Sequence, residues 1–425
     1  MLAMKLDSLL AISTLILSTL LLVSGNAFLM TLLGVRMSLE GFEPVWIGGV
    51  LMCYSIGFVL GTAHVGRIIA RVGHIRTFAA FSALAASAAL AYPLVVHFAW
   101  WAVMRLIGGI AMAALLIVIE SWFSSRATNQ NRSTLFALYL VIFYLATSGG
   151  QILMNAGDPQ SFKLFSLCAL LMVLALIPLT LTRLPAPALE HAPSIPLLSL
   201  LREKPLAFTA ALTSGIVISA FYSLGPVYAN LIGLSLKQLS LFMSLTVLTA
   251  MIFAWPVGKI CDRTERRTVL LWVTLLTALA SGVVALIGTI NLSLLFVSVA
   301  IFMGFGASIY PIAVAILNDR IDSRDIVSAS GGLLLAYGLG SCVGPFLGAT
   351  MIAIMGPGGL FAGITITLLP LVLLARYWLH HADSIPLDAQ EHFVSTPPAT
   401  TSVIVEIDPR NTAFHELETR ANESG

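Results

Sequence analysis

Charge is scarce in this sequence. Only 10% of the 425 residues are Asp, Glu, Lys or Arg, whereas 58% are hydrophobic; a soluble domain carries about 25% charged residues. Such a chain cannot cover an apolar interior with a charged surface, so the composition excludes a soluble globular fold. The net charge of +2 adds little, because in a membrane protein the placement of charge carries the information.

Clustered chemical groups are also missing. The four cysteines lie far apart, which excludes zinc-ligand and redox spacing, and we interpret them as small apolar core residues. No phosphate-binding loop is present, so ATP is not expected to supply energy. The eight histidines are scattered, and no group of His, Asp, Glu or Cys forms a catalytic pattern. We therefore expect no enzyme activity, no cofactor, no metal site and no nucleic-acid partner.

Long apolar runs are abundant instead. A transmembrane helix needs about 20 apolar residues. The first run follows a lone Lys5 but is longer than the core of a signal peptide, so we interpret it as span one. The runs predict twelve spans, near residues 8–33, 45–66, 77–97, 99–123, 134–156, 162–182, 206–230, 238–258, 268–288, 292–317, 327–355 and 359–379.

The basic residues predict how these spans are oriented. With the amino terminus in the cytoplasm, 18 of the 22 Lys and Arg residues fall on the inner side. The outer side receives only Arg36, Lys163 and Lys237, and Arg105 lies within a span. This asymmetry is typical of the positive-inside rule. It predicts a multi-pass protein of the cell inner (plasma) membrane, in contact with the lipid bilayer, with both termini cytoplasmic.

The sequence also contains an internal repeat. The loop after span two recurs 192 residues later, after span eight. Gly109 matches Gly304, and the segment from Tyr144 matches the segment from Tyr337, at nearly the same offset. A duplicated six-span unit explains these matches. It predicts a bundle over 1–182, a proline-rich cytoplasmic linker over 183–205, a second bundle over 206–380, and a polar, disordered cytoplasmic tail over 381–425.

The repeated loop resembles the major facilitator superfamily signature G-x-x-x-D-R-x-G-R-R. The first copy has Ala70 at the acidic position and the second has Glu265 at the second glycine. In the family this loop is a latch between conformations, and topogenic charge is the alternative for the first copy. The matching positions, which we call the latch residues, are Gly66, Arg71, Gly73, Arg76, Gly258, Asp262, Arg263, Arg266 and Arg267.

The sequence of span four resembles the YcaD-like branch of this superfamily. So do Tyr310-Pro311 in span ten and Tyr337-Gly338 in span eleven. The resemblance implies an all-α membrane protein of about twelve transmembrane helices, built as two six-helix pseudo-repeats around a central cavity. It covers all twelve spans and excludes the tail. It implies secondary transport of a small-molecule solute, with protons as the coupling ion, by a protein that we expect to be a monomer.

Two charged residues of span four are the candidate coupling residues. Arg105-x-x-x-Gly109 resembles the family's span-four signature, whose arginine is implicated in proton coupling; snorkelling to the lipid headgroups is the alternative. Glu120 lies about 22 Å along the same helix, only about 60° around its axis. It either carries the proton or pairs with Arg71 or Arg76 in the latch.

Several polar residues are candidates for lining the substrate cavity, which in such proteins is mostly apolar with a few polar groups. A tyrosine near a span end is often only part of the interfacial belt, and a position in this belt is the alternative for Tyr228 and Asn230. The candidates are Asn26, Tyr54, Tyr144, Gln151, Asn155, Tyr222, Tyr228, Asn230, Tyr310 and Tyr337. Predicted helix breaks, where transporters hinge or expose backbone, are Gly225-Pro226, Pro311 and Gly344-Pro345.

The sequence alone leaves the transported solute open. The scarcity of charge favours export of a hydrophobic or drug-like compound, and proton-coupled uptake of a small metabolite is the alternative. The glycine run that antiporters carry in span five occurs here in span eleven, from Gly340 to Gly348, which leaves the direction open. A non-transporting membrane receptor or scaffold on the same fold is a third possibility, and it predicts no solute flux.

Overall fold

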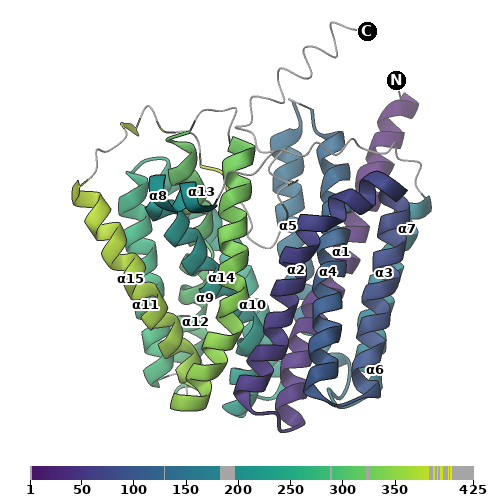
Figure 1. Ribbon diagram of the computed structural model, residues 1–425, viewed down its shortest axis with the longest axis horizontal. Coiled ribbons are helices and arrows are strands. Elements are labelled where there is room, and N and C mark those ends of the chain that lie inside the picture. The colour runs from purple at the N-terminus through teal and green to yellow at the C-terminus, as the bar shows by residue number, and fades with distance from the viewer. Residues whose placement is uncertain are drawn as a thin grey trace, which may run out of the picture.

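A computed structural model describes residues 2–128, 130–181, 197–287, 290–321 and 326–381, and positions 386, 387, 390, 393–395, 401 and 403 of the tail. Residues 183–196 of the predicted linker and the rest of the predicted tail lie outside this description. Twelve spans among the described residues are long and apolar enough to cross a membrane. The predicted all-α architecture is therefore confirmed (Figure 1).

The first six spans are formed by seven helices. The second helix begins with Pro44. Proline has no backbone N–H, but the first N–H groups of a helix have no partner within the helix, so no hydrogen bond is lost. Gly73 separates the second helix from the third with φ at +87°, a left-handed conformation that favours glycine. The helices are α1 (Leu2–Leu39), α2 (Pro44–Val72), α3 (His74–Ala91), α4 (Phe98–Arg126), α5 (Arg132–Ile152), α6 (Phe162–Leu174) and α7 (Leu176–Leu181).

The last six spans follow a short connecting helix. A capping box, in which Ser235 and Gln238 satisfy each other's backbone N–H groups, begins span eight. The helices are α8 (Leu197–Glu203), α9 (Pro205–Leu231), α10 (Leu236–Cys261), α11 (Arg266–Ile287), α12 (Leu292–Gly306), α13 (Ile309–Asn318), α14 (Ile326–Met355) and α15 (Gly359–His381).

The two sets of helices form two bundles that stand side by side (Figure 1). The largest contacts between them are made by three helix pairs, α2 with α14, α5 with α10, and α1 with α9. We call the side at which α1 begins and α15 ends the terminal side, and the other the distal side (Figure 1). The three pairs have matching places in the two halves, as a duplicated unit requires.

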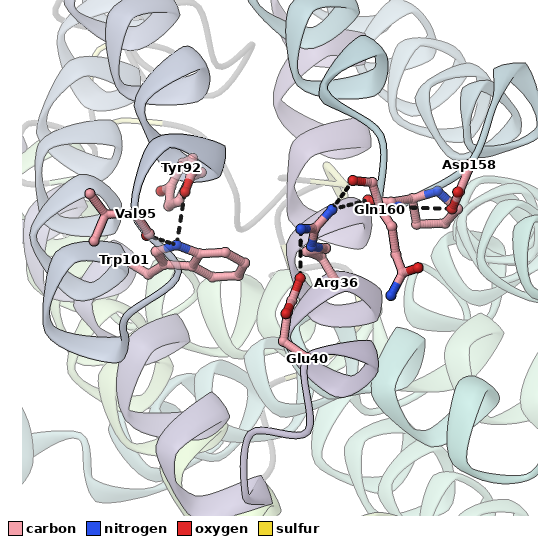
Figure 2. A network of polar contacts seen from close by, with 8 residues as sticks. Arg36, Glu40, Tyr92, Val95, Trp101, Asp158 and Gln160 are labelled. Atoms are coloured by element: carbon pink, nitrogen blue, oxygen red, sulfur yellow. Dashed lines mark hydrogen bonds and ion pairs between the residues drawn. The ribbon is translucent and has the colours of Figure 1, made fainter.

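Polar contacts fix the loops of the distal side (Figure 2). Arg36 lies 2.5 Å from Glu40 one turn later and donates to the backbone carbonyls of Pro159 and Gln160. The Trp101 indole N–H donates to the carbonyls of Tyr92 and Val95, at 3.0 and 2.8 Å, and so closes the turn between α3 and α4. These bonds anchor the distal ends of spans one, three, four and six.

The predicted helix breaks have different outcomes. α9 continues through Pro226 and α14 continues through Pro345, so neither proline ends its helix. Span ten is interrupted between α12 and α13, and Pro311 lies in the first turn of α13. A proline there costs no hydrogen bond, because the first N–H groups of a helix have no partner within it. Of the three predicted breaks, only the one near Pro311 therefore interrupts its span.

Small residues bring α9 and α14 into close contact. A β-carbon on Gly340 would overlap the carbonyl oxygen of Leu212, and one on Gly215 would overlap the carbonyl oxygen of Tyr337. Helices in lipid associate through such close packing, since lipid tails remove most of the hydrophobic driving force. The glycine run of span eleven thus packs the second bundle internally.

Gly340→Ala is expected to destabilise the protein by about 1–3 kcal/mol, the usual cost of overpacking, because backbone must move to admit the methyl group. Thermal unfolding in detergent, followed by size-exclusion chromatography, measures the change. Gly149→Ala is the matched control, because nothing lies within 4 Å of a β-carbon there. Alanine should stabilise that helix position by up to about 1 kcal/mol. Equal unfolding temperatures for the two variants would contradict the packing argument.

Candidate functional site

Four tyrosines meet between the bundles. Tyr144 comes from α5, and Tyr222, Tyr310 and Tyr337 come from α9, α13 and α14. The rings of Tyr310 and Tyr337 are edge-to-face, with centroids 5.2 Å apart. Tyr222 lies close enough to Tyr144 and Tyr337 for electrostatic interaction. Tyr310 and Tyr337 are buried, while Tyr144 and Tyr222 remain half-buried. We call these four residues the tyrosine cluster.

Arg105 is buried in the first bundle, with 1% of its surface exposed. Its guanidinium carbon lies 4.3 Å from the centre of the Tyr54 ring, a cation–π contact. A terminal nitrogen donates to the Met30 sulfur at 2.6 Å, and Tyr54 accepts a bond from Asn26 at 3.2 Å. No carboxylate of the described chain pairs with Arg105, and its Nε lacks a described partner. The side chain is thus held inside the protein rather than extended to the lipid surface.

Glu120 is fully buried near the terminal end of α4. The hydroxyl of Tyr139, on α5, donates to its Oε1 at 2.7 Å. Thr401 of the tail also donates to the carboxylate, through its backbone N–H and its hydroxyl. Arg71 and Arg76, the predicted alternative partners, are exposed. Glu120 is the only acidic residue in the twelve spans.

Three hydrogen-bonded residue pairs join the bundles toward the distal side. Asn155 donates to Ser240 at 2.7 Å, and Asn230 donates to Ser38 at 2.9 Å. The hydroxyls of Ser148 and Ser244 lie 2.6 Å apart. We call these contacts the distal gate. Among the described residues, every direct hydrogen bond between the bundles lies here, so the structure is closed toward the distal side.

The remaining cavity candidates lie elsewhere. Gln151 is buried inside the first bundle, where its side-chain oxygen accepts a bond from Thr31. Tyr228 is fully buried in an aromatic core, edge-to-face with Phe361 at 4.9 Å and beside Phe242. The structure therefore places Asn155 and Asn230 at the distal gate, and Gln151 and Tyr228 in bundle cores. None of these four lies in the tyrosine cluster.

The model of one family, described as Major Facilitator Superfamily, matches residues 11–310. The chain belongs to this superfamily. A second model, described as transmembrane secretion effector, matches residues 232–397. The fold, the twelve spans and the family together make the protein a multi-pass membrane transporter.

Curated relatives agree with this assignment. An uncharacterized MFS-type transporter of Enterobacter sp. (strain 638) is 29% identical over 84% of this chain and 93% of its own. The uncharacterized MFS-type transporter YcaD of Escherichia fergusonii is 28% identical over 86% and 95%. The predicted resemblance to the YcaD-like branch is confirmed. These relatives group the chain with transporters rather than with enzymes, as the sequence predicted.

Solved transporters share the fold. The nucleoside transporter NupG matches with a TM-score of 0.76 and 14% identity, over 88% of this chain and all of its own. A D-xylose-proton symporter matches with a TM-score of 0.66 and 13% identity, over 92% and 98%. At these identities the likeness shows the superfamily's fold and leaves the solute open.

The second copy of the superfamily's loop signature is held by buried arginines. Arg266 is 2% exposed; it donates to the carbonyl of Ala315 at 2.8 Å and lies 2.5 Å from Asp319. Arg267 donates to the carbonyl of Trp378 at 3.1 Å and lies 3.8 Å from Glu265. Burial raises the pKa of the Glu265 carboxyl, against the opposite effect of Arg320. The two arginines thus tie the start of α11 to the ends of α13 and α15.

The first copy is arranged differently. Arg71 and Arg76 are exposed at the terminal side, whereas His74 between them is buried and packs against Trp122, with ring centroids 5.6 Å apart. Asp262 and Arg263 of the second copy are exposed as well. Of the charged latch residues, only Arg266 and Arg267 of the second copy are therefore buried.

Asp319→Ala is expected to destabilise the protein by about 3–5 kcal/mol, because it leaves Arg266 buried without its carboxylate. Arg263→Ala, at an exposed position in the same loop, should change stability by less than about 0.5 kcal/mol. Thermal unfolding of the purified variants compares them. An Asp319→Ala protein as stable as the Arg263→Ala protein would show that the ion pair does not hold the second bundle.

Proposed function

We propose that this chain is a secondary active transporter that moves a small solute by alternating access, driven by protons. Glu120 carries the proposal: a fully buried carboxylate, unique among the spans, is the residue able to bind and release a proton within the bundle. Arg105 assists it as the buried cation of the same helix.

The tyrosine cluster supports the choice of solute. Four rings and four hydroxyls bind flat, neutral or weakly cationic compounds through stacking and single hydrogen bonds. We favour export of a hydrophobic or drug-like compound. Proton-coupled uptake of a small metabolite is the alternative, which the names of the nucleoside transporter and the D-xylose-proton symporter support.

The charge asymmetry supports the orientation. The sequence assigns 18 of the 22 basic residues to the predicted inner side, and the described loops of that side, such as the one between α2 and α3, lie on the terminal side (Figure 1). We propose that this side is cytoplasmic and that the membrane is the inner membrane. The closed distal gate then corresponds to a state open toward the cytoplasm. In the opposite state the gate bonds break, and the latch residues come together as the bundles rock.

A thermal-shift screen of neutral ring compounds tests the site. A solute that binds should stabilise the parent by about 2.7 kcal/mol at one hundred times its Kd. Tyr222→Phe removes one hydroxyl and should weaken binding by about tenfold. Tyr228→Phe is the matched control, because its hydroxyl lies in the aromatic core without a described partner. A compound whose binding weakens equally in both variants does not use the tyrosine cluster.

Flux in proteoliposomes tests the transport itself. A solute found by the screen should move only when a pH gradient is imposed, and an internal pH dye should report proton movement in step with it. Solute movement that is independent of the gradient would refute proton coupling.

A further inference from the structure

We propose that four residues of the chain's own tail, Phe393, Val394, Thr401 and Val403, dock across the terminal side of the two bundles. The docked tail blocks the path to the tyrosine cluster until it is released. The proposal rests on the proposed function, because it assigns a regulator to that path.

The first observation is the burial of Thr401. Only 1% of this tail residue is exposed. Its backbone N–H donates to the two Glu120 oxygens, at 3.3 and 3.1 Å, and its hydroxyl donates to Oε2. Tyr139 donates to the same carboxylate. A polar tail residue thus satisfies the one acidic group of the spans, and bonds to a charged acceptor are about twice as strong as neutral ones.

The second observation is the position of Phe393. Its backbone N–H donates to Asp262 Oδ1 at 2.7 Å, and its ring packs on Gly258, where a β-carbon would lie 2.9 Å from the ring. Val394 and Val403 also pack against the apolar core. Gly258 and Asp262, which Phe393 contacts, are both latch residues of the second copy.

Together these contacts make the tail a bridge. Thr401 binds the first bundle, at α4, and Phe393 binds the second, at the end of α10. The described hydrogen bonds that join the bundles directly all lie at the distal gate. The tail therefore occupies the side that has to close in the next step of alternating access, and it covers the carboxylate that a proton has to reach.

Cysteine labelling of the full-length chain tests docking without any solute. With the four native cysteines replaced by alanine, Val403→Cys reports the docked tail, and Leu387→Cys, at a 53% exposed tail position, is the control. We expect a membrane-impermeant maleimide to label Val403→Cys about tenfold more slowly than Leu387→Cys. Adding Phe393→Ala or Thr401→Val should remove this difference, since each deletes contacts worth about a factor of ten. Equal labelling of the two sites in the parent would overturn docking.

Transport rates test the block. Phe393→Ala and Thr401→Val should raise the initial flux at least twofold, roughly the gain expected from releasing a mostly occupied site. Leu387→Ala should leave it unchanged. Slow labelling of Val403→Cys with unaltered flux in the released variants would overturn the blocking role. Slow labelling without flux in any variant, released ones included, would instead refute the proposed function and leave docking established.

Discussion

Arg105→Ala is expected to abolish gradient-driven solute flux while the protein remains folded in the membrane. Arg105 lies buried against Tyr54 and Met30, with no carboxylate of the described chain paired to it. A charge kept in that position needs a functional reason, because burying it is costly. The loss of its charged contacts, about 1.5–3 kcal/mol, predicts flux below about a tenth of the parent rate.

Two further variants make the Arg105 test specific. Arg67→Ala removes an arginine from an exposed position on the terminal side and should leave flux within about twofold of the parent. Arg105→Lys keeps the charge but loses the planar group that stacks on Tyr54, so it should recover only part of the rate. Parent-level flux in Arg105→Ala proteoliposomes would remove Arg105 from the coupling mechanism.

The helical architecture could be predicted from the sequence, because few backbone structures are stable in lipid. A spanning segment has to satisfy its own backbone, so each apolar run predicts a helix. The last predicted span, 359–379, agrees closely with α15 (Gly359–His381), whereas the first ends too early. α1 continues to Leu39 beyond the predicted end at 33, because Arg36 pairs with Glu40 one turn later and remains helical.

The site followed only in part, because polar partners come from distant helices. The tyrosine cluster was predicted residue by residue, yet so were Tyr228 and Gln151, which face bundle cores. The sequence position of a single tyrosine does not predict whether its side chain faces the other bundle or the core of its own. Tyr139 and Asp319, the partners of Glu120 and Arg266, were missed. The position of Asp319, an acidic residue directly after span ten, could have indicated the ion pair with Arg266.

Glu120→Gln is expected to uncouple the transporter from the proton gradient. Glutamine has the size of glutamate and can still accept the bond from Tyr139, so the packing around α4 should persist. It cannot bind and release a proton at neutral pH. Accumulation of solute under an imposed pH gradient should therefore fall to the level without a gradient, whereas exchange of labelled for unlabelled solute should remain within about twofold of the parent.

The substitution also changes the acceptor of Thr401, so parent and variant should be compared in a Thr401→Val background, in which the tail contact is already weakened. Glu43→Gln is the matched control, an identical chemical change at an exposed position on the distal side. If Glu120 carries the proton, only the Glu120→Gln protein should lose accumulation of the solute while it keeps exchange. If accumulation survives there, the proton travels by another group, and the buried carboxylate has a structural role as an acceptor for Tyr139 and Thr401.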